Sequence, residues 1–320
     1  MQRVLVLGGT GWAGRETARH LIDSGADVTC LARGISGGVP DGAHLIRADR
    51  SAPGAYDRLR GEWDEVIEFS SAPDLVGPAL DALADRTAHW TLVSTISVYA
   101  RNDEPGADES AALVSPADLT QYPDAKVAAE LATRRRLEGR LLIARPGLIV
   151  GPGDPSDRFG YWPARFSRSG PALLPVTQDR FVQVIDVADL AAWLARAATD
   201  GIRGSVNAVG EVHPMAAALA GVADAASFAD DCVEADDDTL RAHDVQYWAG
   251  PRSLPLWLPR ADTALAQRSG RRFLETGGRR RPLAETIERT LADERRRGID
   301  RERRSGLTAA EERAILEALR

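Results

Sequence analysis

The stretch that most constrains this fold lies at the start of the chain, where an aliphatic run leads directly into three evenly spaced glycines. Residues 4–7 are all Val or Leu, as expected of a strand buried on both faces. Gly8 allows a tight bend, Gly11 lets a diphosphate approach the backbone, and Gly14 lets the next helix pack closely. Free amides at the start of that helix suit an anion. The stretch therefore predicts a dinucleotide-binding turn, with Thr10 and Trp12 also in contact with the cofactor.

The rest of the chain alternates between strand-like and helix-like segments. Such alternation predicts an α/β protein with a doubly wound parallel sheet of the Rossmann type, whose ligands lie at the carboxyl ends of the strands. The predicted strands are residues 4–7, 26–32, 44–49, 63–70, 90–95, 141–144 and 204–209, and the clearest helices are 12–22, 73–86 and 123–138.

A change in character after Gly151 indicates a second, smaller unit. We expect residues 1–150 and about 178–210 to form the dinucleotide-binding domain. We expect a smaller, mostly C-terminal substrate-binding lobe from residues 151–177 and about 211–275, followed by a helical tail over 276–320. Thr308 and Glu311 form a capping box for the last helix of that tail.

Composition excludes several classes of protein. The net charge is -7, and the two cysteines and five histidines form neither a disulfide framework nor a metal-ligand pattern. We therefore expect no metal and a reducing, cytoplasmic environment. No stretch approaches the roughly 20 apolar residues of a membrane span, and an acidic chain is not expected to bind nucleic acid.

The end of the second strand bears on which cofactor is used. A site for unphosphorylated dinucleotide usually has Asp or Glu there, to bind the ribose hydroxyls. This chain has Leu31 and Ala32 followed by Arg33, which favours the 2′-phosphate of NADP(H), although NAD(H) stays possible and Arg33 could be an ordinary surface residue. At the ends of later strands, Asp49 could meet the adenine, and Ser70 and Ser71 would leave room for the cofactor.

One tyrosine and one lysine suggest the chemistry. Of the 40 lysine and arginine residues only Lys126 is lysine, and it lies one helical turn after Tyr122. A nearby ammonium, together with an oxidised nicotinamide, is expected to lower the pKa of the tyrosine, which then acts as acid or base. Thr95 would hold the substrate oxygen, with Ser94 and Ser97 as competitors for that role.

At this point the chain resembles a known family, the extended or atypical short-chain dehydrogenases/reductases of the NAD-dependent epimerase/dehydratase type. The resemblance covers roughly residues 1–260. The motifs that carry it are GGTGWAG at Gly8–Gly14, STISVYA at Ser94–Ala100, YPDAK at Tyr122–Lys126 and ARPGLIVGPGD at Ala144–Asp154.

The resemblance implies a role for each matching residue. Thr95, Tyr122 and Lys126 would be the catalytic triad, and Pro146 and Gly147 would lie along the nicotinamide. It also implies a homodimer formed by the helices near 73–86 and 123–138. The second strand, however, lacks the acidic residue of the NAD-retaining sugar epimerases.

The substrate is expected to meet an aromatic and arginine-rich segment, residues 158–166. We expect Arg158, Tyr161 and Trp162 to contact it, together with Ser97 and Arg180, although residues 158–166 could equally be ordinary packing of an irregular segment.

The leading functional hypothesis is an NADPH-dependent reductase of a carbonyl or alcohol group on a small metabolite. The alternative is a sugar or nucleotide-sugar epimerase or dehydratase that retains its cofactor. A dinucleotide sensor or RNA-binding relative without activity is a third possibility, disfavoured because such proteins commonly lose the tyrosine and lysine.

Overall fold

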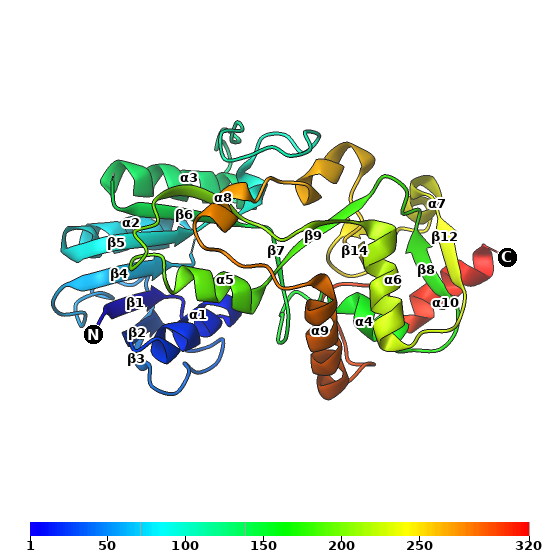
Figure 1. Ribbon diagram of the computed structural model, residues 1–320, viewed down its shortest axis with the longest axis horizontal. Coiled ribbons are helices and arrows are strands. Elements are labelled where there is room, and N and C mark those ends of the chain that lie inside the picture. The colour runs from blue at the N-terminus through cyan, green and yellow to red at the C-terminus, as the bar shows by residue number, and fades with distance from the viewer. Residues whose placement is uncertain (71, 138, 320) are drawn as a thin grey trace.

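The computed structural model describes residues 1–70, 72–137 and 139–319, and in this part of the chain a seven-stranded parallel sheet forms the larger of two lobes (Figure 1). The strand order is β10-β6-β5-β4-β1-β2-β3, so the chain reverses direction across the sheet between β1 and β4. This order confirms the predicted doubly wound fold. The strands are β1 Arg3–Leu7, β2 Asp27–Ala32, β3 His44–Arg47, β4 Trp63–Glu68, β5 Thr87–Val93, β6 Leu141–Pro146 and β10 Gly204–Ala208.

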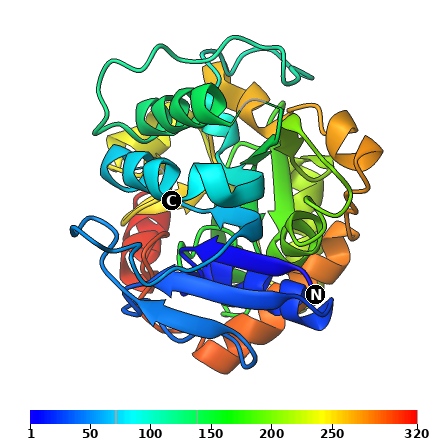
Figure 2. The ribbon, with the colours of Figure 1, turned by 90° about the vertical axis from the view of Figure 1, so that its left-hand side faces the viewer.

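Helices cover both faces of this sheet because its strands are apolar on both sides. Val4 and Val6 face α1 (Trp12–Asp23) and α5 (Val187–Leu194), whereas Leu5 and Leu7 face α2 (Pro73–Leu83) and α3 (Tyr122–Arg136). The 3-10 turn η1 (Ala84–Arg86) continues α2. In Figure 2 this domain faces the viewer, and the loop of residues 101–119 arches beyond α3.

The smaller lobe is built from short strands and helices around one apolar core. β9 pairs with β7 and β11, β8 with β12, and β13 with β14. The strands are β7 Leu148–Val150, β8 Ala172–Pro175, β9 Phe181–Asp186, β11 Val212–Pro214, β12 Cys232–Ala235, β13 Gln246–Trp248 and β14 Ser253–Pro255; the helices are α4 Tyr161–Phe166, α6 Met215–Ala226, α7 Asp237–Ala242, α9 Leu283–Arg297 and α10 Ala309–Ala318, with η2 Ile96–Val98, η3 Arg260–Ala266 and α8 Arg271–Glu275 nearby.

Two boundaries differ from the sequence prediction. The strand β9 lies in the smaller lobe's sheet, and Val182 and Val184 pack in that lobe's core, whereas Ile185 near its end packs in the core of the nucleotide domain. The segment 276–320 is not a separate tail, because Leu291 and Ile315 are buried in the same core. The capping box at Thr308 is present as predicted.

No helix among the described residues has both the length and the apolarity required to cross a membrane.

Candidate active site

The glycine-rich turn has the geometry that its sequence predicts. Gly8 has a φ of +96°, which favours glycine, and its carbonyl accepts a hydrogen bond from the Gly11 amide at 3.0 Å. A Cβ on Gly14 would lie 2.5 Å from the Gly8 carbonyl oxygen, so only glycine lets α1 approach β1 this closely. No side chain caps α1, whose first turn therefore has free amides for an anion.

A cavity of about 310 Å³ lies beside this turn, at the carboxyl ends of β1, β2 and β3. Arg33 and Asp49, both exposed, lie near each other there, since the Arg33 charge helps to lower the pKa of Asp49 after the larger effect of the Ser51 hydroxyl. The structure thus brings together six of the residues predicted for the cofactor: Gly8, Thr10, Gly11, Arg33, Asp49 and Ser70. Ser71 lies outside the described residues.

A buried ion pair in the wall of this cavity was missed by the sequence analysis. Arg50 binds both carboxylate oxygens of Glu68 and also donates to the Ser70 hydroxyl at 2.9 Å and the Leu75 carbonyl at 3.0 Å. Arg50 thereby ties the end of β4 to the loop after β3. In the sequence, Arg50 is one arginine among many, and its neighbours do not indicate that it is buried or paired.

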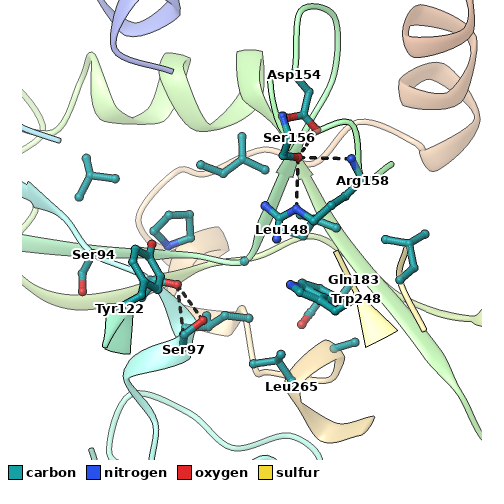
Figure 3. A pocket seen from close by; sticks show the side chains of 18 of the residues that line it. Ser94, Ser97, Tyr122, Leu148, Asp154, Ser156, Arg158, Gln183, Trp248 and Leu265 are labelled. Carbon is teal, nitrogen blue, oxygen red and sulfur yellow. Dashed lines mark hydrogen bonds between the residues drawn. The ribbon is translucent and has the colours of Figure 1, made fainter. Parts of the chain in front are cut away.

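A second cavity, of about 440 Å³, opens between the nucleotide domain and the smaller lobe (Figure 3). Its walls contain the three predicted catalytic residues, three of the predicted cofactor contacts and two of the predicted substrate contacts. These are Thr95, Tyr122 and Lys126, then Trp12, Pro146 and Gly147, and finally Ser97 and Arg158.

Thr95 follows β5 after one intervening residue, Ser94, and caps the short turn η2. Its hydroxyl accepts a hydrogen bond from the Ser97 amide at 3.2 Å and donates to the Ser97 Oγ at 3.3 Å. Ser94, a competitor for the same role, is buried, and its Oγ has no hydrogen-bond partner in the described part of the chain. The hydroxyls of Ser94, Thr95 and Ser97 therefore all line this cavity, where each could bind an oxygen atom.

Tyr122 begins α3, as the following proline predicts, and its side chain is 55% exposed. Desolvation of its hydroxyl raises its pKa, against the smaller opposing effects of the Thr95 hydroxyl and the Arg158 charge. The expectation that Lys126 lowers this pKa is therefore not met by the polypeptide alone. A phenol with a raised pKa is protonated at neutral pH and is able to donate its proton.

Lys126 lies one turn along α3 and is almost fully buried. Its Nζ donates to the Val93 carbonyl at 2.7 Å and lies 5.9 Å from the centre of the Tyr122 ring. Burial lowers the pKa of Lys126 to about 8, and Glu68 and Glu130 act in the opposite direction. The ammonium form therefore still dominates at neutral pH, with hydrogen-bond donors directed at the cavity.

Three of the predicted substrate contacts are wrong in this structure. Tyr161 and Trp162 belong to the short helix α4 and are buried in the core of the smaller lobe, where the Trp162 indole donates to the Pro255 carbonyl at 2.8 Å. Arg180 is also buried, and its guanidinium binds Asp237 and the Leu258 carbonyl. These side chains pack in the interior or form hydrogen bonds there, and they do not line the cavity.

Other lining residues come from parts of the chain distant in sequence. Trp248 and Leu256 close the cavity from the smaller lobe, and both have positive φ, +69° and +70°. Such strained backbone often accompanies functional sites. Gln183 also lines the cavity, with its amide held by the Gly210 and Arg268 carbonyls. All three residues are distant in sequence from Tyr122, and only the fold brings them to the cavity.

Comparison with known proteins agrees with this architecture. The family model for the NAD dependent epimerase/dehydratase family matches residues 4–210. The 2′-dehydrokanamycin reductase of Streptomyces kanamyceticus is 27% identical over 223 residues, which cover 67% of this chain and 63% of that protein, less than two thirds of its length.

Solved structures of epimerases share the fold. UDP-glucose 4-epimerase of Thermus thermophilus, in complex with NAD, has a TM-score of 0.66 at 20% identity, covering 92% of this chain and 99% of that chain. UDP-N-acetylglucosamine 4-epimerase of Bacillus cereus has a TM-score of 0.71 at 14% identity, covering 94% and 99%. With a family model that matches well over half of its residues, the chain belongs to the NAD-dependent epimerase/dehydratase family.

Proposed function

We propose that this protein is an NADPH-dependent reductase that converts a carbonyl group on a small metabolite to an alcohol. The observation that carries the proposal is the convergence of Thr95, Tyr122 and Lys126 on one cavity at the carboxyl end of the parallel sheet. The reductase named among its relatives supports this reaction class.

The residues present fit a dinucleotide. The uncapped start of α1 and the turn that only Gly14 can accommodate would hold the diphosphate, and the cavity beside Arg33 would hold the adenosine half. The buried Ser94 hydroxyl and the Lys126 ammonium would serve the nicotinamide half. When bound, the cofactor supplies a hydride to the carbonyl carbon.

The protein's own residues account for the rest of the reaction. The Thr95 hydroxyl holds the carbonyl oxygen, and the protonated Tyr122 delivers a proton to that oxygen as negative charge develops. Lys126, fixed by the Val93 carbonyl, supplies positive charge behind the tyrosine. A tyrosine whose pKa is raised is protonated at neutral pH, which suits reduction in the forward direction.

The catalytic assignment is tested with Tyr122→Phe, which removes only the hydroxyl. We expect kcat for NADPH-dependent carbonyl reduction to fall by about 100-fold or more, because the general acid is lost. NADPH affinity measured by fluorescence titration should change little. Turnover within a few-fold of the wild type would mean that the mechanism is wrong.

The cofactor assignment is tested with Arg33→Ala. Loss of one exposed, charge-assisted contact should weaken NADPH binding by about tenfold and leave NADH binding unchanged. Arg58→Ala, which removes an exposed arginine outside both cavities, is the matched control. An equal loss for NADPH and NADH would show that Arg33 does not bind the 2′-phosphate.

A further inference from the structure

One wall of the 440 Å³ cavity contains a half-buried arginine, Arg158, whose surroundings differ from those of three buried arginines. Arg145, Arg165 and Arg50 each form a close ion pair with a buried carboxylate, at 2.6 Å for the first two. Arg158 lines the cavity and, within the described part of the chain, has no carboxylate oxygen within 4.0 Å. Arg158 therefore carries a positive charge at the cavity that no carboxylate of the described residues pairs with directly.

The contacts of Arg158 hold the guanidinium without using its terminal nitrogens. Its Nε donates to the Ser156 Oγ at 3.2 Å, and its central carbon lies 5.4 Å from the centre of the Trp248 ring. Figure 3 shows the side chain extending from the Ser156 loop towards the side of the cavity where Tyr122 and Ser97 lie. Neither terminal amino group has a hydrogen-bond partner among the described residues, so both are available for the paired hydrogen bonds that carboxylates and phosphates prefer.

The nearest acidic side chain does not supply the missing partner. Asp154 uses one carboxylate oxygen for the Ser156 amide, at 2.8 Å, and the other for the Ser156 hydroxyl, at 2.9 Å. Asp154 is nearly fully buried, and it is the one acidic residue among the described residues that line the cavity. Among the charged residues that line the cavity, Lys126 and Arg158 therefore leave a net positive charge facing the ligand.

We propose that Arg158 forms an anion-binding subsite, and that the natural substrate is a small carbonyl compound carrying a carboxylate or phosphate group. The inference rests on the proposed reductase function and specifies the substrate class. The guanidinium holds the oxyanion group against Trp248 while Thr95 and Tyr122 hold the carbonyl oxygen. Because both ends of the substrate are then fixed, Arg158 acts as an orienting residue as well as a binding residue.

Binding of simple anions tests the subsite without any turnover. Isothermal titration calorimetry with benzoate, neutral benzamide and inorganic phosphate would be performed on the full chain, Arg158→Met, Arg158→Lys and the control Arg58→Met. We expect benzoate or phosphate to bind wild type and the control at least tenfold more tightly than Arg158→Met, with Arg158→Lys between them and benzamide weak throughout. Whichever anion binds more tightly identifies a carboxylate or a phosphate as the natural group.

The subsite is refuted if neither anion binds wild type, or if Arg158→Met binds them as tightly as the control does. Melting temperatures and far-ultraviolet circular dichroism of the four proteins verify that each is folded. The lysine variant keeps the test valid should the methionine variant be unstable, since a retained charge with altered geometry still predicts weaker, measurable binding.

Reduction of a matched pair of aldehydes separates this inference from the proposed function. Wild type should reduce 4-carboxybenzaldehyde with at least tenfold higher kcat/KM than methyl 4-formylbenzoate, and Arg158→Met should lose that preference. Equal rates for acid and ester, unaffected by the substitution, would refute the subsite and leave the reductase intact. Anion binding that depends on Arg158, with no oxidation of NADPH by either aldehyde, would instead refute the reductase and leave the subsite intact.

Discussion

Replacing Lys126 with methionine should change how the stability of the protein responds to pH. Methionine has a similar length but no charge, and Lys126 is 4% exposed with its pKa lowered from 10.5 to about 8. The charged lysine is therefore costlier in the folded state than in the unfolded state. Between these two pKa values the unfolded chain binds more protons, so raising the pH stabilises the folded wild type.

The magnitude follows from the size of the shift. A shift from 10.5 to about 8 corresponds to about 3 kcal/mol, of which about 2–3 kcal/mol falls between pH 7 and pH 10. The stability of wild type minus that of Lys126→Met should rise by this amount over that range. The methionine variant also loses the hydrogen bond to the Val93 carbonyl. That loss is the same at every pH, so it changes the size of the stability difference but not its dependence on pH.

Urea denaturation of both proteins at half-unit pH intervals, monitored by circular dichroism, measures this difference. Subtracting the two curves removes every other titrating group that the proteins share. If the curves stay parallel from pH 7 to pH 10, Lys126 does not carry a lowered pKa, and its burial in the active site is contradicted.

Three further predictions concern the glycine-rich turn, the buried Arg50–Glu68 ion pair and the oligomeric state. Gly14→Ala should lower the free energy of unfolding in urea by about 1–3 kcal/mol and weaken NADPH binding, because its Cβ would lie 2.5 Å from the Gly8 carbonyl oxygen. The control Gly221→Ala, in α6 where a Cβ has room, should instead raise the free energy of unfolding by about 1 kcal/mol, and equal effects of the two substitutions would contradict the close approach at Gly14. Arg50→Met should cost about 3–5 kcal/mol, because it leaves a buried carboxylate unpaired, and a loss below 1 kcal/mol would show that the pair is not buried. We propose that α2 and α3 form a homodimer interface, so Leu131→Asp, at a leucine on α3 that is 43% exposed, should convert a dimer to a monomer in light scattering, whereas a monomeric wild type would refute the interface.

The nucleotide domain could be predicted from the sequence because local rules determine most of it. The aliphatic runs of β1 and β6 can only be strands buried on both faces, and glycine is required at Gly8 by a positive φ and at Gly14 by a close approach. Thr308 is predicted to cap the last helix, and its hydroxyl accepts a hydrogen bond from the Glu311 amide at 3.2 Å. In each case the evidence lies within a few residues of the feature.

The substrate side of the cavity could not be predicted in the same way. Residues 158–166 contain aromatic and charged side chains, and composition alone does not show that Tyr161 points into the core of the lobe while Arg158 lines the cavity. Which side chain points which way depends on how α4 packs against segments more than 90 residues away. One such contact is the hydrogen bond that the Trp162 indole donates to the Pro255 carbonyl. Trp248 is placed by the same long-range packing.

The most direct test of the proposed reductase is to identify the cofactor that the purified protein carries and then to titrate the cofactor-free protein with NADPH and NADH. We expect a protein that releases little or no nicotinamide nucleotide on denaturation and binds NADPH at least tenfold more tightly than NADH, with Arg33→Ala removing the preference. Release of one equivalent of NAD per chain would contradict it, since a retained cofactor indicates transient oxidation of the substrate, as in an epimerase or dehydratase.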